Sequence, residues 1–402
     1  MITTSMESPI LPAMECIESS QRYVFCEINP GRRNNRPKTD PTKMNLKSIP
    51  LLFILTQILW AGNIKTKNVI LITLDGIRWE DLFTGADEDL YQNKDYVKDL
   101  EGAKKYWDDD PDVRRKKLMP FMWNTIAEQG QIYGNVEKGS TMELKNPYWF
   151  SYPGYSEILV GYVDSTRNSN ASENNPNVTV LEFIHNQPGF KNKVAAFCSW
   201  DVFDYIINEE RAGFIVNSGQ EKFQGLKGNE QNELMNEMMF QIPVPWGSVR
   251  FDAFTYHFAM NYLKAKRPRL FYISFDETDE YAHYGQYDQY LYSMNRLDGY
   301  IQSIWEWVQS TYTLKDRTTL IISTDHGRGD KVLDEWQSHG SAIAGAKKVW
   351  LAVIGPDTPA FGEIENRDPV YSTQIAKTIA TFLNVDYKNE RPVGDAIRPV
   401  FK

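Results

Sequence analysis

From Asn68 onward, short apolar runs alternate with segments of helical spacing, and no other feature restricts the possible folds so strongly. Runs typical of strands buried on both faces occur at 68–75, 193–200, 269–276, 318–325 and 349–357. Apolar residues at helical spacing occupy 118–130, 250–267, 290–310 and 372–384. This alternation predicts a mostly parallel central sheet with helices on both faces, which is a three-layer α/β/α sandwich.

The composition of the 402-residue chain supports a packed domain, with 42% hydrophobic and 13% aromatic residues. Neither an internal repeat nor a strong linker interrupts residues 65–402, so we expect one domain there. The formal net charge is -9 and the sequence has no long basic stripe. Stable nucleic-acid binding is therefore not expected, although a nucleotide remains open as a substrate.

The segment MNLKSIPLLFILTQILWAGN, which begins at Met44, has the layout of a secretory signal peptide. Its apolar run is too short to span a bilayer comfortably, so no membrane span is expected after its removal. Residues 1–43 are polar and are interpreted as a non-native or disordered extension. The sequence thus predicts a signal peptide over 44–62 and a periplasmic or secreted protein, whereas a start at Met1 would make the run internal.

Aspartate and histidine residues collect just after the expected strands, where open α/β sheets bind their ligands. Asp279 and His283 are four residues apart, so a helix there would place both side chains on one face. The full set is Asp75, Asp279, His283, Asp325, His326 and His339.

Carboxylate and imidazole ligands without cysteine suit Zn²⁺ in an open catalytic site, or Mn²⁺. Each residue alone has an ordinary explanation: Asp279 as a helix cap, His283 on an exposed turn, His339 in a loop. Their order along successive strand ends indicates a site for two divalent metal ions, with Zn²⁺ favoured over Mn²⁺.

The ordered pattern LDG … SYPGY … DETDEYAH … TDHG … HGS resembles the alkaline phosphatase superfamily, and the type I phosphodiesterase/nucleotide pyrophosphatase branch in particular. The resemblance spans Asn68 to about Pro399. It implies a first metal ion held by Asp279, His283 and His339. It implies a second metal ion held by Asp75, Asp325, His326 and Ser151.

In that superfamily a hydroxyl or modified cysteine at the start of a helix attacks phosphorus or sulfur. The segment YWFSYPGYSEILVG offers Ser151 at that place, with Ser156 as the alternative hydroxyl. Without the resemblance, Ser151 would be an ordinary helix N-cap. The resemblance therefore implies a phosphoserine intermediate on Ser151.

Two further residues are candidates for contacts with the substrate. The superfamily often places an asparagine some twenty residues after the nucleophile, and Asn170 is our choice among several in DSTRNSNASENNPN. Arg328 follows His326 closely and is either a contact for the substrate anion or a solvated loop arginine.

Departures from the sequence patterns of other branches of the superfamily reduce the number of possible activities. Tyr155 stands where sulfatases have arginine, and the interval from Ser151 to Asp279 is too short for the inserted domain of phosphoglycerate mutases. The sequence predicts an exported phosphodiesterase for a small phosphate ester such as a nucleotide or phospholipid head group. A phosphomonoesterase of the same fold is the alternative, followed by a sulfatase and a non-catalytic binding protein.

Overall fold

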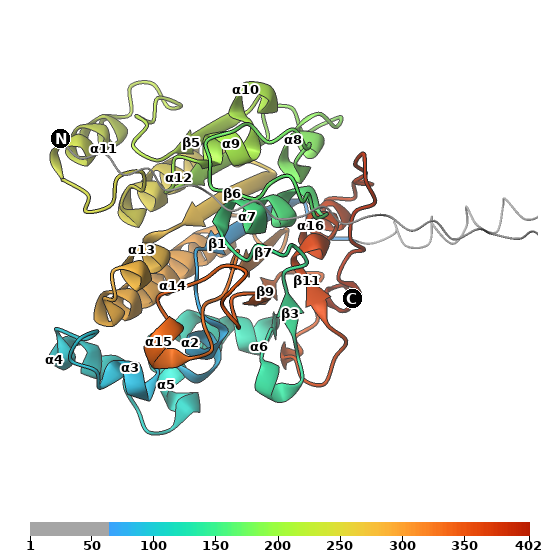
Figure 1. Ribbon diagram of the computed structural model, residues 1–402. Coiled ribbons are helices and arrows are strands. Elements are labelled where there is room, and N and C mark those ends of the chain that lie inside the picture. The colour runs from blue at the N-terminus through green and yellow to red at the C-terminus, as the bar shows by residue number, and fades with distance from the viewer. Residues whose placement is uncertain (1–63) are drawn as a thin grey trace, which may run out of the picture. The chain divides into compact units, whose positions relative to one another are not determined.

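The central sheet has eight strands, and it runs through the middle of the computed structural model, which describes residues 64–402 (Figure 1). The strands are β1 (Asn68–Leu74), β2 (Gln131–Tyr133), β4 (Val194–Cys198), β5 (Ile215–Ser218), β6 (Leu270–Phe275), β7 (Thr318–Ser323), β9 (Leu351–Ile354) and β10 (Gly362–Glu363). Their order is β10-β2-β9-β7-β1-β6-β4-β5. A small three-stranded sheet joins β11 (Val370–Tyr371), β3 (Met142–Glu143) and β8 (Lys348–Val349).

The expected mostly parallel sheet is confirmed. Strand β1 pairs in parallel with β6 and β7, and β4 pairs in parallel with β5 and β6. Strand β9, from the apolar run at 349–357, is antiparallel to both β7 and β2. Hydrophobicity predicted that this run is a strand, but it carries no information about strand direction.

Side chains of β1 alternate between two cores, as the twofold period of a strand requires. Ile70, Ile72 and Leu74 pack on one face, while Val69 and Leu71 pack on the other. The first face is covered by α12 (Asp252–Lys266) and α14 (Tyr287–Ser310), and the second by α7 (Ser151–Val160), α8 (Val180–His185), α9 (Phe203–Ile207) and α16 (Ile375–Phe382). The expected three-layer sandwich is therefore confirmed (Figure 1).

Shorter helices fill the connections. They are α2 (Trp79–Thr84), α3 (Glu88–Tyr91), α4 (Leu100–Ala103), α5 (Pro111–Leu118), α6 (Ala127–Gln129), α10 (Glu209–Ala212), α11 (Glu230–Gln241), α13 (Glu277–His283) and α15 (Val332–Glu335). Four 3₁₀ turns cover Lys104–Tyr106, Val136–Lys138, Ser372–Gln374 and Arg398–Val400. The helix expected over 118–130 contains a π-helical turn, Met122–Ile126, which leads into α6.

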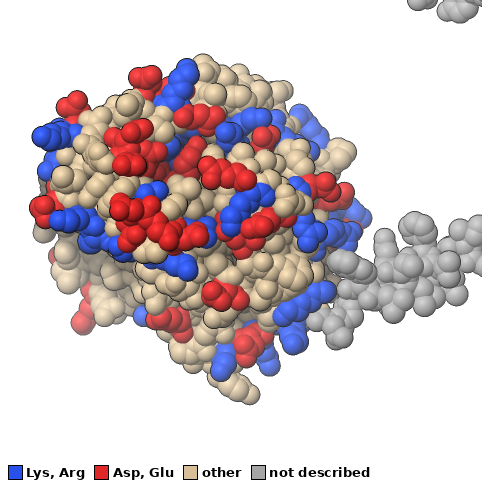
Figure 2. Space-filling view, turned by 90° about the horizontal axis from the view of Figure 1, so that it is seen from below, with Lys and Arg blue, Asp and Glu red and all other residues tan. Residues whose placement is uncertain are grey.

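Of the expectations about location and partners, those on membrane spans and nucleic-acid binding can be compared with residues 64–402. The predicted signal peptide over 44–62 and the extension over 1–43 lie outside the described residues. No helix within 64–402 is both long and apolar enough to cross a membrane. On the face shown in Figure 2, acidic and basic side chains are interspersed, a pattern that gives no support to stable nucleic-acid binding.

A buried carboxylate joins α14 to the helical segment that contains the π turn. Asp298 is only 1% exposed and accepts hydrogen bonds from the backbone N–H groups of Phe121 and Met122, at 2.7 and 2.9 Å. These N–H groups belong to the first turn of their helix and have no partner within it. Asp298 thus fixes this segment against the sheet.

We expect Asp298→Ala to lower the free energy of unfolding by about 2 to 4 kcal/mol, because two buried donors lose their acceptor. Asp298→Asn keeps an oxygen and should lose less. The measurement is urea denaturation followed by circular dichroism. Gln302→Ala, on the exposed side of the same helix, should stay within about 0.5 kcal/mol of the wild type. An alanine variant as stable as this control would show that Asp298 does not fix the segment.

Candidate metal centre and active site

Three neighbouring strands bring the candidate ligands to one edge of the sheet. Strand β1 lies between β6 and β7, and their carboxyl ends are level in the pairing register. Asp75 follows β1, and Asp325 with His326 follows β7. Asp279 and His283 lie on α13, which begins directly after β6. The parallel register therefore explains why residues far apart in sequence converge.

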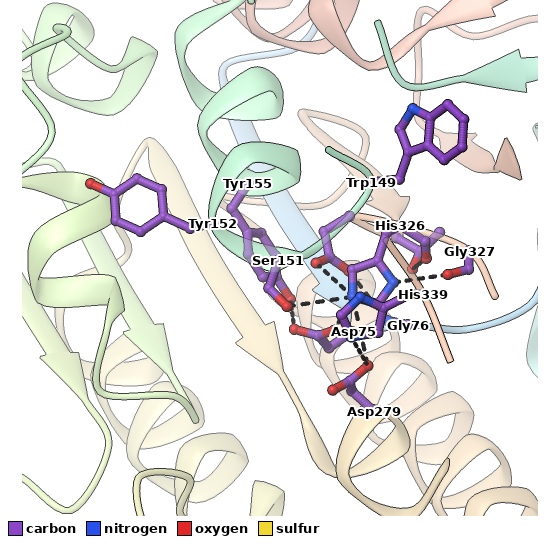
Figure 3. Close-up of polar contacts among 12 residues, drawn as sticks. Asp75, Gly76, Trp149, Ser151, Tyr152, Tyr155, Asp279, His326, Gly327 and His339 are labelled. Carbon is purple, nitrogen blue, oxygen red and sulfur yellow. Dashed lines mark hydrogen bonds and ion pairs between the residues drawn. The ribbon is translucent and has the colours of Figure 1, made fainter. Parts of the chain in front are cut away.

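The first group of ligands consists of Asp75, Asp325 and His326, whose ligand atoms lie within 4.8 Å of one another. Nε2 of His326 is 3.3 Å from Oδ1 of Asp75 and 3.6 Å from Oδ2 of Asp325. Ser151, the first residue of α7, directs its hydroxyl at this group, with Oγ 3.4 Å from Nε2 of His326 (Figure 3). The expected set of one metal ion is thus assembled around Ser151.

The second group forms beside the first. Ligand atoms of Asp279, His326 and His339 lie within 4.8 Å of one another. Nε2 of His283 is 3.0 Å from Oδ2 of Asp279 and 3.0 Å from Nε2 of His339. The structure therefore brings together all seven residues of the expected ligand set. It also places His326 between the two groups, whereas the sequence assigned it to one ion only.

The donor atoms of these groups fit a bound cation. Oδ1 of Asp75 and Oδ2 of Asp325 are buried and accept no hydrogen bond. Nδ1 of His326 donates to the carbonyl oxygen of Gly327 at 2.9 Å, so a neutral imidazole presents its lone pair on Nε2 to the carboxylates. A cation or an added proton must separate such groups, and carboxylate–imidazole sets favour Zn²⁺ or Mn²⁺.

The pKa shifts of these residues also indicate that positive charge is favoured among the ligands. Burial, followed by repulsion from Asp279, raises the pKa of Asp75, and burial followed by Asp75 raises that of Asp325. Burial alone would lower the pKa of His326, but the carboxylates of Asp325 and Asp75 outweigh it and raise this pKa to about 9. Positive charge is therefore favoured within this group of ligands, and a divalent ion would supply it in place of the proton.

Arg328 lies behind Asp279 rather than in the cavity. Its buried guanidinium donates to the Asp279 carboxylate and to three carbonyl oxygens: Gly76 at 3.0 Å, Asp279 at 3.1 Å and Gln337 at 2.7 Å. Although burial acts in the opposite direction, Arg328 holds the pKa of Asp279 well below its usual range. The contact of Arg328 with protein groups positions a candidate ligand and leaves the predicted substrate contact without support.

A cavity of about 170 Å³ opens in front of the ligands, and Asn170 lies in its wall. Oδ1 of Asn170 accepts a hydrogen bond from the backbone N–H of Tyr152 at 3.0 Å, so the side chain is held beside Ser151. The role of Asn170 as a donor to phosphate remains a prediction. The lining residues are Asp75, Ser151, Asn170, Trp200, Val249, Asp276, Asp279, Glu280, His283 and His339.

Two positioning contacts on α7 were not predicted from the sequence. The Tyr155 hydroxyl donates to Oδ2 of Asp75 at 2.8 Å, which orients that carboxylate (Figure 3). The buried Glu157 accepts hydrogen bonds from the backbone N–H groups of Lys145 and Asn146. Glu157 thereby anchors the loop that precedes Ser151. An acidic residue within an apolar helix was the only local signal for this contact.

The loop that precedes Ser151 also contacts the loop that contains His339. Oδ1 of Asn146 accepts hydrogen bonds from the N–H groups of Tyr148 and Trp149, and Trp149 adopts a φ of 53°. The carbonyl oxygen of Trp149 then accepts the N–H of Gly340 at 2.9 Å. A backbone hydrogen bond therefore joins the loop that precedes Ser151 to the loop that contains His339.

Comparison with known proteins identifies the class. The family model described as type I phosphodiesterase / nucleotide pyrophosphatase matches residues 87–339, which is more than half of the chain. The chain belongs to this family, and the protein is a hydrolase of phosphoric esters within the alkaline phosphatase superfamily. A search of curated proteins gives no match.

Solved structures show the same fold. The phosphonate monoester hydrolase SpPMH from Silicibacter pomeroyi is 13% identical with a TM-score of 0.52, covering 84% of this chain and 76% of that chain. A variant of the alkaline phosphatase PafA is 11% identical with a TM-score of 0.52 and coverages of 84% and 99%. The lipoteichoic acid synthase LtaP from Listeria monocytogenes is 12% identical, with a TM-score of 0.52 and coverages of 82% and 75%.

We expect Tyr155→Phe to weaken Zn²⁺ binding by about 10- to 100-fold, because Asp75 loses the donor that orients it. Calorimetric titration of the metal-free protein measures this affinity. Tyr152→Phe is the matched control, since the Tyr152 hydroxyl donates to the Glu173 carbonyl oxygen and points away from the ligands (Figure 3). Equal Zn²⁺ affinity in both variants would exclude the positioning role of Tyr155.

Proposed function

We propose that the protein is an exported phosphodiesterase that uses two divalent metal ions and forms a phosphoserine intermediate on Ser151. The observation that carries this proposal is the position of the Ser151 hydroxyl. It lies at the start of a ten-residue helix, at the mouth of the cavity and against both ligand groups. Export is supported by the sequence of residues 44–62.

The two ligand groups would hold the metal ions, with Zn²⁺ favoured over Mn²⁺ by the ligand types. When bound, such ions stabilise the negative charge that develops on the attacking and leaving oxygens of an in-line displacement. The residues in question are Asp75, Asp325, His326 and Ser151 on one side, and Asp279, His283 and His339 on the other.

Residues of the chain carry out the phosphoryl transfer. Oγ of Ser151 gives up its proton and forms a bond to phosphorus, while the bond between phosphorus and the leaving oxygen breaks and that oxygen takes up a proton. The oxygen of a water molecule next forms a bond to phosphorus, the bond between phosphorus and Oγ of Ser151 breaks, and Oγ takes up a proton from that water. The positive end of the α7 helix dipole, which lies at Ser151, favours the anionic phosphoryl group. In this proposal the Asn170 amide, which lies in the cavity wall, donates to a phosphoryl oxygen.

The charge of the cavity favours a diester over a monoester. Among the described residues that line it, Asp276 and Glu280 are carboxylates outside the two ligand groups, and no lining residue is lysine or arginine. A phosphomonoester carries up to two negative charges, whereas a diester carries one. The diester therefore meets less repulsion, and a phosphomonoesterase is the outcome that a direct comparison has to exclude.

We expect the Zn²⁺-loaded protein to hydrolyse bis-p-nitrophenyl phosphate with a kcat/KM at least about tenfold above that for p-nitrophenyl phosphate. Release of p-nitrophenol measures both rates, and the Mn²⁺-loaded protein is assayed in parallel. A preference for the monoester would make the protein a phosphatase. Absence of turnover with both esters would contradict the proposed function.

We expect Ser151→Ala to lower turnover by about a thousandfold or more, because the nucleophile is lost, while bound metal is retained in part. Mass spectrometry of the wild type quenched during turnover should find a phosphoryl group on the peptide that contains Ser151. Ser156→Ala is the control, since its hydroxyl accepts a hydrogen bond from Asn175 inside the helix packing. Unchanged turnover in Ser151→Ala would exclude the assignment.

A further inference from the structure

Two buried carboxylates near the metal centre have no part in the proposed metal binding. Asp252 is the first residue of α12 and is 0% exposed, and Glu277 is the first residue of α13 and is 2% exposed. Neither belongs to the two groups of candidate ligands. Buried carboxylates are costly unless hydrogen bonds or positive charge compensate them, so their partners indicate their role.

Each of these carboxylates accepts hydrogen bonds from the backbone at the start of the other residue's helix. Oδ1 of Asp252 accepts the N–H of Asp276 at 3.0 Å, and Oδ2 accepts the N–H of Glu277 at 3.1 Å. In return, Oε1 of Glu277 accepts the backbone N–H of Asp252 at 2.8 Å. We call this arrangement of Asp252 and Glu277 the reciprocal cap, and it joins the amino-terminal ends of α12 and α13.

The reciprocal cap takes the place of the usual side-chain caps of both helices. Phe251, which precedes α12, and Asp276, which precedes α13, make no side-chain capping hydrogen bond. The first N–H groups of a helix have no partner within it, and a carboxylate beside them also interacts favourably with the helix dipole. Asp252 and Glu277 therefore each satisfy backbone donors that the neighbouring helix leaves without a cap.

Further contacts fix the two carboxylates of the reciprocal cap. The hydroxyl of Ser199, which follows β4, donates to Oδ1 of Asp252 at 2.6 Å. Oε2 of Glu277 is paired with Arg296 of α14. Burial, followed by repulsion from Glu277, raises the pKa of Asp252 to about 7. Because the two acids repel each other, their proximity is explained by the donors around them and not by attraction between them.

Helix α13 is short and carries candidate ligands of one metal ion. Its seven residues include Asp279 and His283. A helix of this length is not stable by itself, so its position depends on tertiary contacts. The Thr278 hydroxyl donates to the carbonyl oxygen of Asp75 at 2.6 Å, which joins α13 to the other ligand group. A shift at the start of α13 would therefore move its two candidate ligands relative to Asp75.

We propose that Asp252 is a positioning residue: through the reciprocal cap it holds α13 where Asp279 and His283 can bind one of the two metal ions. This inference rests on the proposed function, because it concerns one of the metal ions of that function. Asp252 does not line the cavity, so it acts through the backbone of α13 and not on the substrate. The alternative is that the reciprocal cap contributes only to the stability of the fold.

Calorimetric titration of the metal-free protein with Zn²⁺ tests the inference and requires no turnover. We expect the wild type to bind two ions, and Asp252→Asn to bind one of them at least about tenfold more weakly, because a carboxamide has one acceptor oxygen where the carboxylate has two. In His283→Ala one ligand group is already incomplete. In that background, Asp252→Asn should change the affinity for the remaining ion by less than about threefold.

Asp298→Asn is the matched control. Asp298 is also a buried carboxylate that accepts two backbone N–H groups at the start of a helical segment, but that segment carries no candidate ligand. Urea denaturation without Zn²⁺ measures the free energy of unfolding of both variants. We expect both to lose stability, whereas Asp298→Asn binds both Zn²⁺ ions as the wild type does. An equal loss of Zn²⁺ affinity in the two variants would assign Asp252 to fold stability alone and overturn the inference.

A second variant decides the question if Asp252→Asn does not fold. Glu277→Gln keeps one acceptor oxygen for two donors, the backbone N–H of Asp252 and the guanidinium of Arg296. It should weaken the binding of the same Zn²⁺ ion by at least about threefold. Unchanged affinity for both ions in Glu277→Gln would then overturn the inference.

The titration also separates this inference from the proposed function. If no ester is hydrolysed but Asp252→Asn weakens one of two bound Zn²⁺ ions, the proposed function fails and the positioning role stands. If Asp252→Asn binds both ions as tightly as the wild type, the positioning role is excluded even if diesters are hydrolysed. A wild type that binds fewer than two Zn²⁺ ions excludes it as well.

Discussion

Burial of several carboxylates around one imidazole is the constraint on which the rest of the site depends. Asp75 and Asp325 are 1% and 0% exposed, and both lie within 4 Å of Nε2 of His326. Carboxylates in such a place are costly unless positive charge compensates them. Arg328 provides one fixed positive charge at Asp279. The remainder has to be exchangeable, and exchangeable positive charge facing a cavity is what a hydrolase with metal cofactors requires.

The sequence predicted the sheet, its layers and the convergence of the candidate ligands at one edge because all three follow from local patterns. A strand buried on both faces is a continuous apolar run, and parallel strands bring their carboxyl ends to one edge. Asp75 and Asp325 could therefore be paired before any contact was known. The antiparallel direction of β9 could not be predicted, because hydrophobicity is the same for either direction of a strand.

The contacts of Arg328, Tyr155 and Glu157 also could not be predicted from local sequence patterns. Arg328 meets Gly76, which is 252 residues away in the chain, and Tyr155 meets Asp75, 80 residues away. From sequence alone, an arginine after a strand is assigned to solvent or to an anion, and a glutamate on a helix is assigned to its exposed face. Only the tertiary contacts show that these side chains orient the candidate metal ligands and the loop that precedes Ser151.

Charge separation within the cavity connects the metal centre to the choice of substrate. In the proposed function the two ligand groups form the side that attracts phosphate, since divalent ions bound there would outweigh their carboxylates. Asp276 and Glu280 lie outside these groups and make the adjoining wall negative. A second anionic group on a substrate would face this acidic wall, so Asp276 and Glu280 disfavour polyphosphate esters.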